Sequence, residues 1–398
     1  MSRLHIGLFN DSFPPTIDGV AQTAKNYAEF LQKNHADVTV VTPAYKGVRD
    51  GYPFEVFRYP SLRASRRFDY RVGNPLGPET CRRLRAEEFD LLHIHAPFVS
   101  SLLAERVNRR PRVPAVLTYH TKFDVDISRW IRPPGMRRAA MRFVLENINA
   151  ADEVWVVSEG CGRALRDIGY RGGYRVMENG TDFPFGRAPE TAVEALRERY
   201  GIPADAFVFL YVGRMMWYKN LRLILDALCL LRKEGPPFRA LLVGDGPEAA
   251  AVRAYAADRG LEACAIFPGA VSDRRLLRVY YSLADMFLFP STYDTSGIVV
   301  KEAAACCCPS LLIRGSCAAE RAEHGVSAFL AEETAASCAR TLADACRDRE
   351  RLAAVGRGAG ERLYLSWEEA VAQAYARYTA ILDKWPGPLP YNARAAWF

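Results

Sequence analysis

The fold class is decided by one stretch of sequence, Phe289-Pro290-Ser291-Thr292-Tyr293-Asp294-Thr295-Ser296-Gly297-Ile298-Val299-Val300-Lys301-Glu302. A short apolar run ends at Phe289, a turn of small and polar residues follows, and a helical segment begins at Ile298. This order is the repeating unit of a parallel α/β sheet, and ligands bind at the carboxyl ends of such strands. We therefore expect Asp294 and Glu302 to contact a ligand. The alternatives are a helix N-cap for Asp294 and a surface acid for Glu302.

Apolar strands and helical segments alternate along the whole chain, and the alternation occurs twice. In the first half, strands are expected over residues 4–9, 38–42, 91–95, 115–119 and 153–157, with a helix over 20–34. In the second half, strands are expected over residues 207–212, 240–243, 265–267, 286–289 and 310–313. Two α/β domains with parallel sheets, and a cleft between them, follow from this order.

The domain boundaries follow from the same alternation. We predict an N-terminal Rossmann-like domain over residues 1–183 and a C-terminal one over 206–366. Residues 184–205, rich in proline, glycine and charge, are expected to form a linker with one short helix. A last helix over 367–384 and an extended tail over 385–398 complete the prediction.

The composition, with 398 residues of which 49% are hydrophobic and 25% charged, is that of a globular protein. The apolar runs are far shorter than the roughly 20 residues that span a bilayer, and the chain begins without a signal-peptide core. We therefore expect neither a membrane crossing nor secretion. Ten scattered cysteines indicate a reducing, cytosolic environment, and the consecutive Cys306, Cys307 and Cys308 are interpreted as small buried residues on a helix.

The net charge of +7 comes entirely from the first half of the chain. Residues 1–180 contain 27 Lys and Arg against 20 Asp and Glu, whereas the remaining residues contain 26 of each class. A one-sided basic excess suggests an acidic partner, either nucleic acid or an anionic lipid surface.

The loop over residues 10–19 joins the first strand to the first helix. Gly19 stands at the N-terminus of that helix, where free N–H groups and the helix dipole favour a phosphate. The loop has neither a G-x-G-x-x-G pattern nor a Walker lysine. A plain connecting loop is the alternative.

Two further turns of the second half have residues suited to an anion. Gly213 and Arg214 follow a strand, and Lys219 stands where the next helix begins, so both cations could contact a diphosphate beyond the strand end. Gly244 and Gly246 form another strand-to-helix turn at the same edge. Solvated surface charge is the alternative for the two cations.

These pieces, in this order, resemble the glycosyltransferases of family 4, which have the GT-B fold of two Rossmann-like domains with parallel sheets facing each other across a cleft. The resemblance extends over nearly the whole chain. It is carried by residues 14–19, 92–95, 118–121, 179–182, 213–219, 243–247 and 294–302. The last segment matches the family's paired acids separated by seven residues, and the last helix resembles the segment that packs back on the first domain.

The resemblance implies roles for individual residues. Arg214 and Lys219 would bind the diphosphate of a nucleotide-sugar donor, Glu302 would bind its ribose, and Asp294 and His120 would contact the sugar. The family has Glu where this chain has Asp294, so the reach toward the sugar is one methylene shorter. The other expected donor-binding residues are Gly19, Gly213, Gly244, Gly246, Thr295, Ser296, Gly297 and Ile298.

The implied reaction is hexose transfer with retention at the anomeric carbon, and the nucleoside diphosphate is the leaving group. Arg214, Lys219 and the helix N-termini would stabilise the charge that develops on that group. No cofactor and no metal is required. Asp124-Val125-Asp126 resembles the metal-binding Asp-x-Asp of another glycosyltransferase fold but lacks its context, so we interpret it as a loop or helix start.

His93 and His95 belong to one expected strand. We predict that at most one of them faces the cleft, and a buried position or a place in the wall is favoured for each.

The acceptor is indicated by two basic segments, residues 58–85 and 128–150. Apolar and cationic side chains interleave in the second, which suits an anionic membrane surface. An amphipathic helix with a solvated charged face is the alternative. The resemblance extends to members that glucosylate diacylglycerol or mannosylate phosphoinositide, so we favour a lipid acceptor over a saccharide. We expect a cytoplasmic protein, and peripheral attachment to the inner face of the membrane is left open.

Other functional classes stay open at this point. A catalytically silent GT-B module that binds a nucleotide sugar or a partner is the main alternative, because Asp294 departs from the family pattern. Nucleic-acid binding by the basic first half is disfavoured by the lack of a recognised motif. A GT-B epimerase or phosphorylase is a further alternative, the latter disfavoured by the lack of a cofactor-lysine context.

Overall fold

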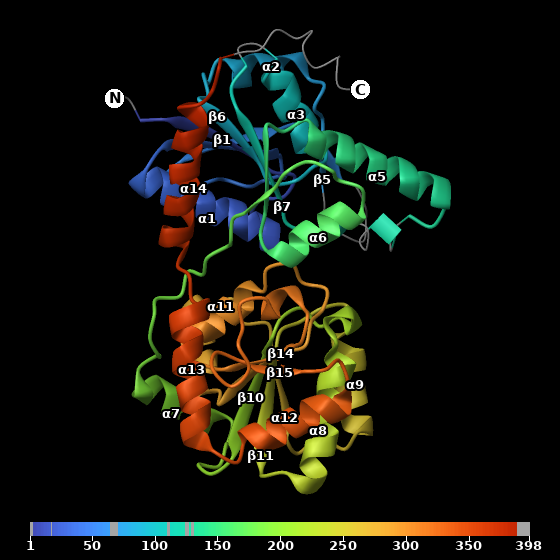
Figure 1. The fold of residues 1–398 in the computed structure, drawn as a ribbon, viewed down its shortest axis with the longest axis vertical. Helices are drawn as coiled ribbons and strands as arrows, with labels where there is room; N and C mark the ends of the chain where they lie inside the picture. Colours follow the sequence, from blue (N-terminus) through green and yellow to red (C-terminus); the bar gives the residue numbers. More distant parts are fainter. Residues whose placement is uncertain are drawn as a thin grey trace. The chain divides into compact units, whose positions relative to one another are not determined.

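The computed structural model describes residues 3–16, 18–63, 71–109, 112–123, 127–128 and 131–387. The chain forms two compact units. Unit 1 comprises Met1–Asn179 and Trp367–Phe398, and unit 2 comprises Gly180–Ser366. Each unit has one large parallel sheet between layers of helices (Figure 1).

The sheet of unit 1 has seven parallel strands in the order β3-β2-β1-β6-β7-β8-β9. The strands are β1 (His5–Phe9), β2 (Asp37–Pro43), β3 (Glu55–Tyr59), β6 (Leu91–Ile94), β7 (Ala115–Tyr119), β8 (Glu153–Val156) and β9 (Arg175–Val176). A separate antiparallel pair is formed by β4 (Ser61–Arg63) and β5 (Arg71–Gly73). The helices are α1 (Gly19–Asn34), α2 (Pro78–Arg85), α3 (Val99–Val107), α5 (Pro134–Asn149), α6 (Glu159–Asp167) and α14 (Trp367–Leu382).

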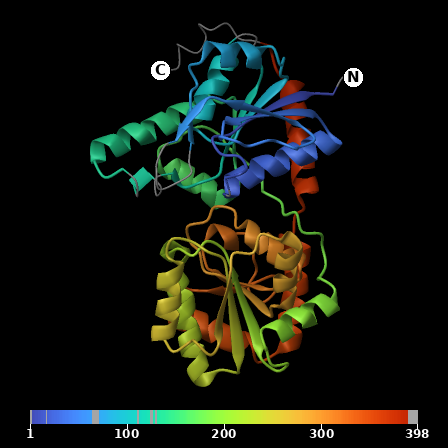
Figure 2. The same ribbon diagram turned by 180° about the vertical axis from the view of Figure 1, so that it is seen from behind.

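Helices α1 and α14 lie side by side on one face of the unit 1 sheet, as both views show (Figure 2). The helices α1 and α14 bury Tyr27 and Tyr378, whose rings meet the strand residues His93 and Trp155. Trp367, at the start of α14, packs against Tyr27 with 5.8 Å between the ring centroids. The C-terminal helix is therefore part of the core of unit 1.

The sheet of unit 2 has six parallel strands in the order β12-β11-β10-β13-β14-β15. The strands are β10 (Phe207–Val212), β11 (Phe238–Val243), β12 (Ala265–Gly269), β13 (Met286–Phe289), β14 (Ser310–Ile313) and β15 (Phe329–Ala331). The α-helices are α7 (Glu190–Arg199), α8 (Leu221–Glu234), α9 (Ala249–Asp258), α10 (Arg274–Leu283), α11 (Ile298–Ala305), α12 (Ala335–Ala345) and α13 (Arg349–Leu363). Two 3-10 turns are η1 (Trp217–Lys219) and η2 (Cys317–Ala319).

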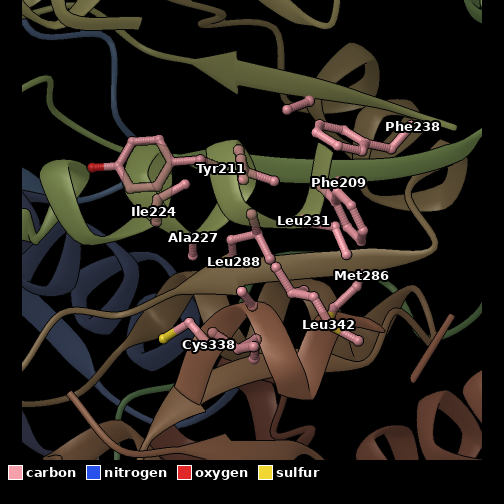
Figure 3. Close-up of a cluster of buried hydrophobic side chains, with 14 of the residues drawn as sticks. Phe209, Tyr211, Ile224, Ala227, Leu231, Phe238, Met286, Leu288, Cys338 and Leu342 are labelled. Carbon is pink, nitrogen blue, oxygen red and sulfur yellow. The ribbon is translucent and has the colours of Figure 1, made fainter. Parts of the chain in front are cut away.

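Both faces of the unit 2 sheet are buried, which explains why β10 is apolar throughout. Phe209 and Tyr211 point to one face, where they pack with helices α8 and α12, and Figure 3 shows this cluster. Val208 and Leu210 alternate to the other face and pack with α10 and α11. Residues 184–205, predicted as a linker, belong to unit 2, where α7 packs against α10.

Both sheets have the strand order of a doubly wound fold, in which connections on either side of one strand pair run in opposite directions. Such a switch point lies between β1 and β6 in unit 1 and between β10 and β13 in unit 2. Ligands of this fold bind beyond the carboxyl ends of the strands at the switch point. In unit 2, the loops concerned are 213–219 and 290–297.

The three consecutive cysteines correct one expectation. Helix α11 ends at Ala305, so the cysteines do not lie on a helix. Cys306 is its C-cap, Cys307 has φ of 52°, and Cys308 precedes Pro309 at the entry to β14. Burial raises the pKa of the Cys306 thiol to about 11, so this thiol is inert near neutral pH.

Candidate functional site

The loops after β10 and β11 in unit 2 contact one another through their backbones. Gly213 N–H donates to Val243 O over 3.1 Å, and Met215 N–H donates to Asp245 O over 2.9 Å. Gly244 has φ of +142°, and a Cβ there would lie 1.9 Å from Gly213 O. Only glycine permits this approach, so Gly244 holds the loops after β10 and β11 together.

Lys219 and Asp294 form an ion pair across the switch point of unit 2. Lys219 follows β10 and Asp294 follows β13, and both side chains are partly buried. The Lys219 ammonium also lies 5.5 Å and 5.8 Å from the ring centroids of Tyr218 and Tyr293. The second carboxylate oxygen of Asp294, Oδ2, is buried and has no hydrogen-bond partner within the described part of the chain.

The N-cap of helix α11 is Gly297, in the left-handed conformation with φ of 60° and ψ of 49°. The N-cap alternative for Asp294 is therefore wrong. Among the described residues, no side chain caps this helix. Thr295 and Ser296 precede the N-cap, and the first backbone N–H group of the helix is that of Ile298. A helix N-terminus in this state favours an anion or a hydroxyl ligand.

Glu302 lies one to two turns into helix α11, and only 6% of its side chain is exposed. The surface-acid alternative is therefore wrong. Arg274 donates to its Oε1 over 2.7 Å, and the hydroxyl of Tyr281 donates to its Oε2 over 2.8 Å. Both partners come from α10, which packs beside α11. The charge of Glu302 is thus compensated inside the protein.

Arg214 and Gly246 both lie at the carboxyl-end edge of the unit 2 sheet, which we call the rim. Arg214 is exposed, and its carbonyl accepts a hydrogen bond from the hydroxyl of Tyr211 over 3.1 Å. Gly246 lies between β11 and α9, and its N–H donates to the Asp245 carboxylate over 2.7 Å. The rim therefore has an exposed cation at Arg214 and a partly buried one at Lys219.

In unit 1, three histidines form a buried cluster on the face covered by α1 and α14. His95 Nδ1 and His120 Nε2 share a hydrogen bond of 3.0 Å, and the rings of His93 and His95 are 4.0 Å apart. His93 also bonds the hydroxyls of Tyr378 and Thr118. Burial lowers the pKa of His120 to about 3 and those of His93 and His95 well below the ordinary value. All three are neutral at pH 7.

The histidine cluster also corrects an expectation. Side chains of a strand alternate with a period of two, so residues 93 and 95 point to the same face. The argument that the two side chains alternate was therefore wrong, whereas the prediction that at most one of them faces the cleft stays a prediction. Their buried position agrees with the preferred interpretation.

The loop after β1 leads to Gly19, the first residue of α1. Asp18 is the N-cap of this helix, and its carboxylate accepts a hydrogen bond from Ala21 N–H over 2.7 Å. Gly19 is exposed, and a Cβ there would have open space around it. Earlier in the loop, Asp11 accepts hydrogen bonds from the backbone and hydroxyl of Ser100, both 2.9 Å long. Asp11 thereby joins the loop to α3 across the switch point of unit 1.

The described residues of the two basic segments belong to unit 1. In α5, Arg138 and Arg142 are exposed, and so is Met136, whereas Arg137 is partly buried. No helix within the described residues is long and apolar enough to cross a membrane. Those residues also contain no cluster of three metal-ligating side chains. The predicted loop Asp124-Val125-Asp126 and part of the segment 58–85 lie outside the described residues.

The structure also identifies functional candidates that the sequence analysis missed. Arg274 and Tyr281 bond Glu302, and Asp182 bonds Arg274. Arg274 is separated from Glu302 by 28 residues and from Asp182 by 92. No short spacing could have indicated these contacts.

Comparisons with known proteins define the class. The family described as "Glycosyltransferase Family 4" matches residues 17–183, and the family described as "Glycosyl transferases group 1" matches residues 192–362. Among solved structures, sucrose-phosphate synthase from Thermosynechococcus elongatus has a TM-score of 0.76 at 20% identity, covering 96% of this chain and 100% of that chain. HepE from Anabaena, in complex with UDP and glucose, has a TM-score of 0.75 at 20% identity, covering 95% and 100%. The fold is GT-B, and the protein is a glycosyltransferase.

Related enzymes of known activity indicate the class of reaction. The alpha-monoglucosyldiacylglycerol synthase of Streptococcus pneumoniae is 26% identical over 310 residues, which are 76% of this chain and 69% of the relative. The GDP-mannose-dependent alpha-mannosyltransferase of Corynebacterium glutamicum is 25% identical over 389 residues, 95% and 89% of the two chains. The chain belongs to glycosyltransferase family 4, and its enzyme class is hexosyltransferase.

Proposed function

We propose that this protein transfers a hexose, with retention at the anomeric carbon, from a nucleotide sugar to a hydroxyl of a lipid or a glycan. The observation that carries the proposal is the pairing of Lys219 with Asp294 at the switch point of unit 2, beside the N-terminus of α11. A cation and free N–H groups suit a diphosphate, and a carboxylate suits sugar hydroxyls. The names of the relatives point to UDP-glucose-like or GDP-mannose-like donors.

In the proposed complex, Arg214 and Lys219 bind the diphosphate, and Glu302 accepts hydrogen bonds from the ribose hydroxyls. Asp294 and the backbone over residues 295–298 bind the sugar. When the diphosphate enters, it competes with Asp294 for the Lys219 ammonium, and this frees the carboxylate for the hydroxyls. Asp294 reaches Lys219 although its side chain is one methylene shorter than the Glu of the family.

The chemical step breaks the bond between the anomeric carbon and the diphosphate oxygen. Negative charge develops on the leaving oxygen, and Arg214, Lys219 and the N-terminus of α11 stabilise it. In this proposal the protein's own cations provide the stabilisation, and no metal takes part. The roles that the resemblance to family 4 implies for Gly19 and His120, at the diphosphate and the sugar, stay predictions.

The proposal is tested with a thermal-shift panel of the UDP and GDP forms of glucose, galactose, mannose and N-acetylglucosamine. We expect one donor to raise the melting temperature selectively and to be slowly hydrolysed to its nucleoside diphosphate. Stabilisation without any release of nucleotide would instead indicate a catalytically silent binding module. No stabilisation by any of these donors would contradict the proposed donor class.

A lipid acceptor is the favoured form of the proposal. The surface of α5 combines the exposed Arg138 and Arg142 and the partly buried Arg137 with the exposed Met136, which suits an anionic membrane. The names of relatives that act on diacylglycerol or phosphatidylinositol point the same way. We expect the protein to attach to this surface peripherally.

Vesicle sedimentation tests the membrane surface. Charge reversal of Arg137, Arg138 and Arg142 to Glu should abolish sedimentation with phosphatidylglycerol vesicles, because about 1 kcal/mol of attraction is lost for each basic residue near the surface. The matched control replaces the same three residues with Lys, which keeps the charge and should keep binding. Equal sedimentation of the Glu and Lys variants would show that the charged face is simply solvated.

A further inference from the structure

The carboxylate of Glu302 is buried and bonded at both oxygens. Arg274 occupies a position on Oε1 and Tyr281 occupies one on Oε2. A buried charge is tolerated only when it is paired and hydrogen-bonded. A carboxylate offers about four lone-pair positions, so two of them remain for another ligand.

Arg274 is itself fixed by three different contacts. Its Nε donates to Asp182 Oδ2 over 2.9 Å, its Nη2 bonds both Asp182 and Glu302, and its guanidinium carbon lies 4.4 Å from the centroid of the Phe183 ring. Burial alone would lower the pKa of Arg274, but the carboxylates of Glu302 and Asp182 raise it. The planar guanidinium therefore remains charged and has one defined orientation.

We propose that Arg274 is a positioning residue of the donor site, which holds the Glu302 carboxylate oriented for the ribose of the nucleotide. Arg274 acts through Glu302 and does not itself contact the donor. A guanidinium bound at one oxygen, with Tyr281 at the other, prevents the carboxylate from rotating. The two remaining lone-pair positions are then aimed in fixed directions, as a pair of neighbouring ribose hydroxyls requires. This inference rests on the proposed function, in which Glu302 binds the ribose.

Asp182 orients Arg274. It belongs to the segment 179–182, which is one of the motifs that carry the resemblance to family 4. By bonding two nitrogens of Arg274, Asp182 orients the guanidinium that in turn orients Glu302. A carboxylate outside the nucleotide-binding loops thereby affects donor affinity.

The first experiment measures the Kd of UDP and GDP by calorimetry and the kinetics of donor hydrolysis. Arg274→Ala should raise the KM for the donor and the Kd of the nucleotide about tenfold to hundredfold, the range expected for losing a hydrogen bond to a charged group. The kcat should change less, because the ribose does not react. Arg274→Lys keeps the charge but cannot bond two carboxylates in the same way, so it should restore part of the affinity. Arg275→Ala, at the exposed neighbouring position, should behave as the wild type.

A double-mutant cycle separates positioning from a general structural effect. In a Glu302→Gln background, Arg274→Ala should weaken nucleotide binding by less than about threefold, because the charge to be positioned is gone. A full loss in that background would overturn the inference. Should Arg274→Ala fail to fold, Asp182→Asn, which loosens Arg274 without removing it, should still raise the donor KM. An unchanged KM in that variant would also count against it.

The outcomes distinguish this inference from the proposed function. If Glu302→Gln leaves nucleotide binding unchanged, the ribose role of Glu302 is wrong and the proposed function must be revised. If Glu302→Gln weakens binding while Arg274→Ala behaves like Arg275→Ala, the donor site stands and only the positioning role of Arg274 is overturned.

Discussion

The Asp11 carboxylate is buried, and burial disfavours its charged form. We therefore expect the stability of unit 1 to depend on pH at this residue. Burial raises the pKa of Asp11 from 3.8 to about 6, although the hydrogen bonds from Ser100 and Val99 act in the opposite direction. The unfolded chain therefore loses this proton before the folded one does. Stability contributed at this site is highest below pH 3.8, falls as the pH rises toward 6, and stays low above it.

The rise of the Asp11 pKa from 3.8 to about 6 corresponds to about 3 kcal/mol of free energy. Asp11→Asn should imitate the neutral carboxyl group. The amide oxygen can accept from Ser100 N–H, and the amide NH₂ can donate to the Ser100 hydroxyl oxygen. We expect the Asp11→Asn substitution to stabilise the protein by up to about 3 kcal/mol at pH 7.5, with no difference from the wild type near pH 4.

The assay compares melting temperatures of wild type and Asp11→Asn between pH 4 and 8. For a unit of this size, 1 kcal/mol corresponds to about 2–4 °C, so the variant should melt several degrees higher at pH 7.5. Asp167→Asn, at an exposed position of α6, is the control and should show no such trend. A difference independent of pH, or a destabilised variant at every pH, would refute the reasoning.

Two further predictions concern the loops of unit 2. Lys219→Ala removes the cation from the proposed diphosphate site and leaves Asp294 without its partner. Donor turnover should therefore fall by about a hundredfold or more, which corresponds to about 3 kcal/mol. Kinetics like those of the wild type would contradict the assignment of Lys219 to the diphosphate. Gly244→Ala should destabilise unit 2 by about 2 kcal/mol or more, because the new Cβ would collide with Gly213 O and the backbone has a φ of +142°. Gly19→Ala is the control: its Cβ has open space, so its melting temperature should equal that of the wild type.

Most strands of the two large sheets could be predicted because their residues form a continuous apolar run. Strand β10 is apolar at every position, as a strand buried on both faces must be, and its predicted and observed bounds coincide. Strands β3, β4, β5, β9 and β15 were missed. In β3, Glu55 and Arg58 interrupt the apolar pattern, and β15 has only three residues.

The site was predictable only in part, for a physical reason. Lys219 and Asp294 could be associated because each follows a strand, and the carboxyl ends of parallel strands meet at one edge. The contact of Arg274 with Glu302 depends on how α10 packs beside α11, and no local pattern encodes such packing. The surface-acid alternative for Glu302 failed because burial is a property of the folded chain, and the N-cap alternative for Asp294 failed because the helix begins only after Gly297.

The most direct test of the central claim is proton NMR of donor turnover, with the nucleotide sugar that stabilises the protein in the thermal-shift panel. We predict that the wild-type protein releases the nucleoside diphosphate and that the first sugar product has the α configuration of the donor. Release should be lost in Lys219→Ala. A first product with inverted configuration, or no release from any stabilising donor, would contradict a retaining hexosyltransferase.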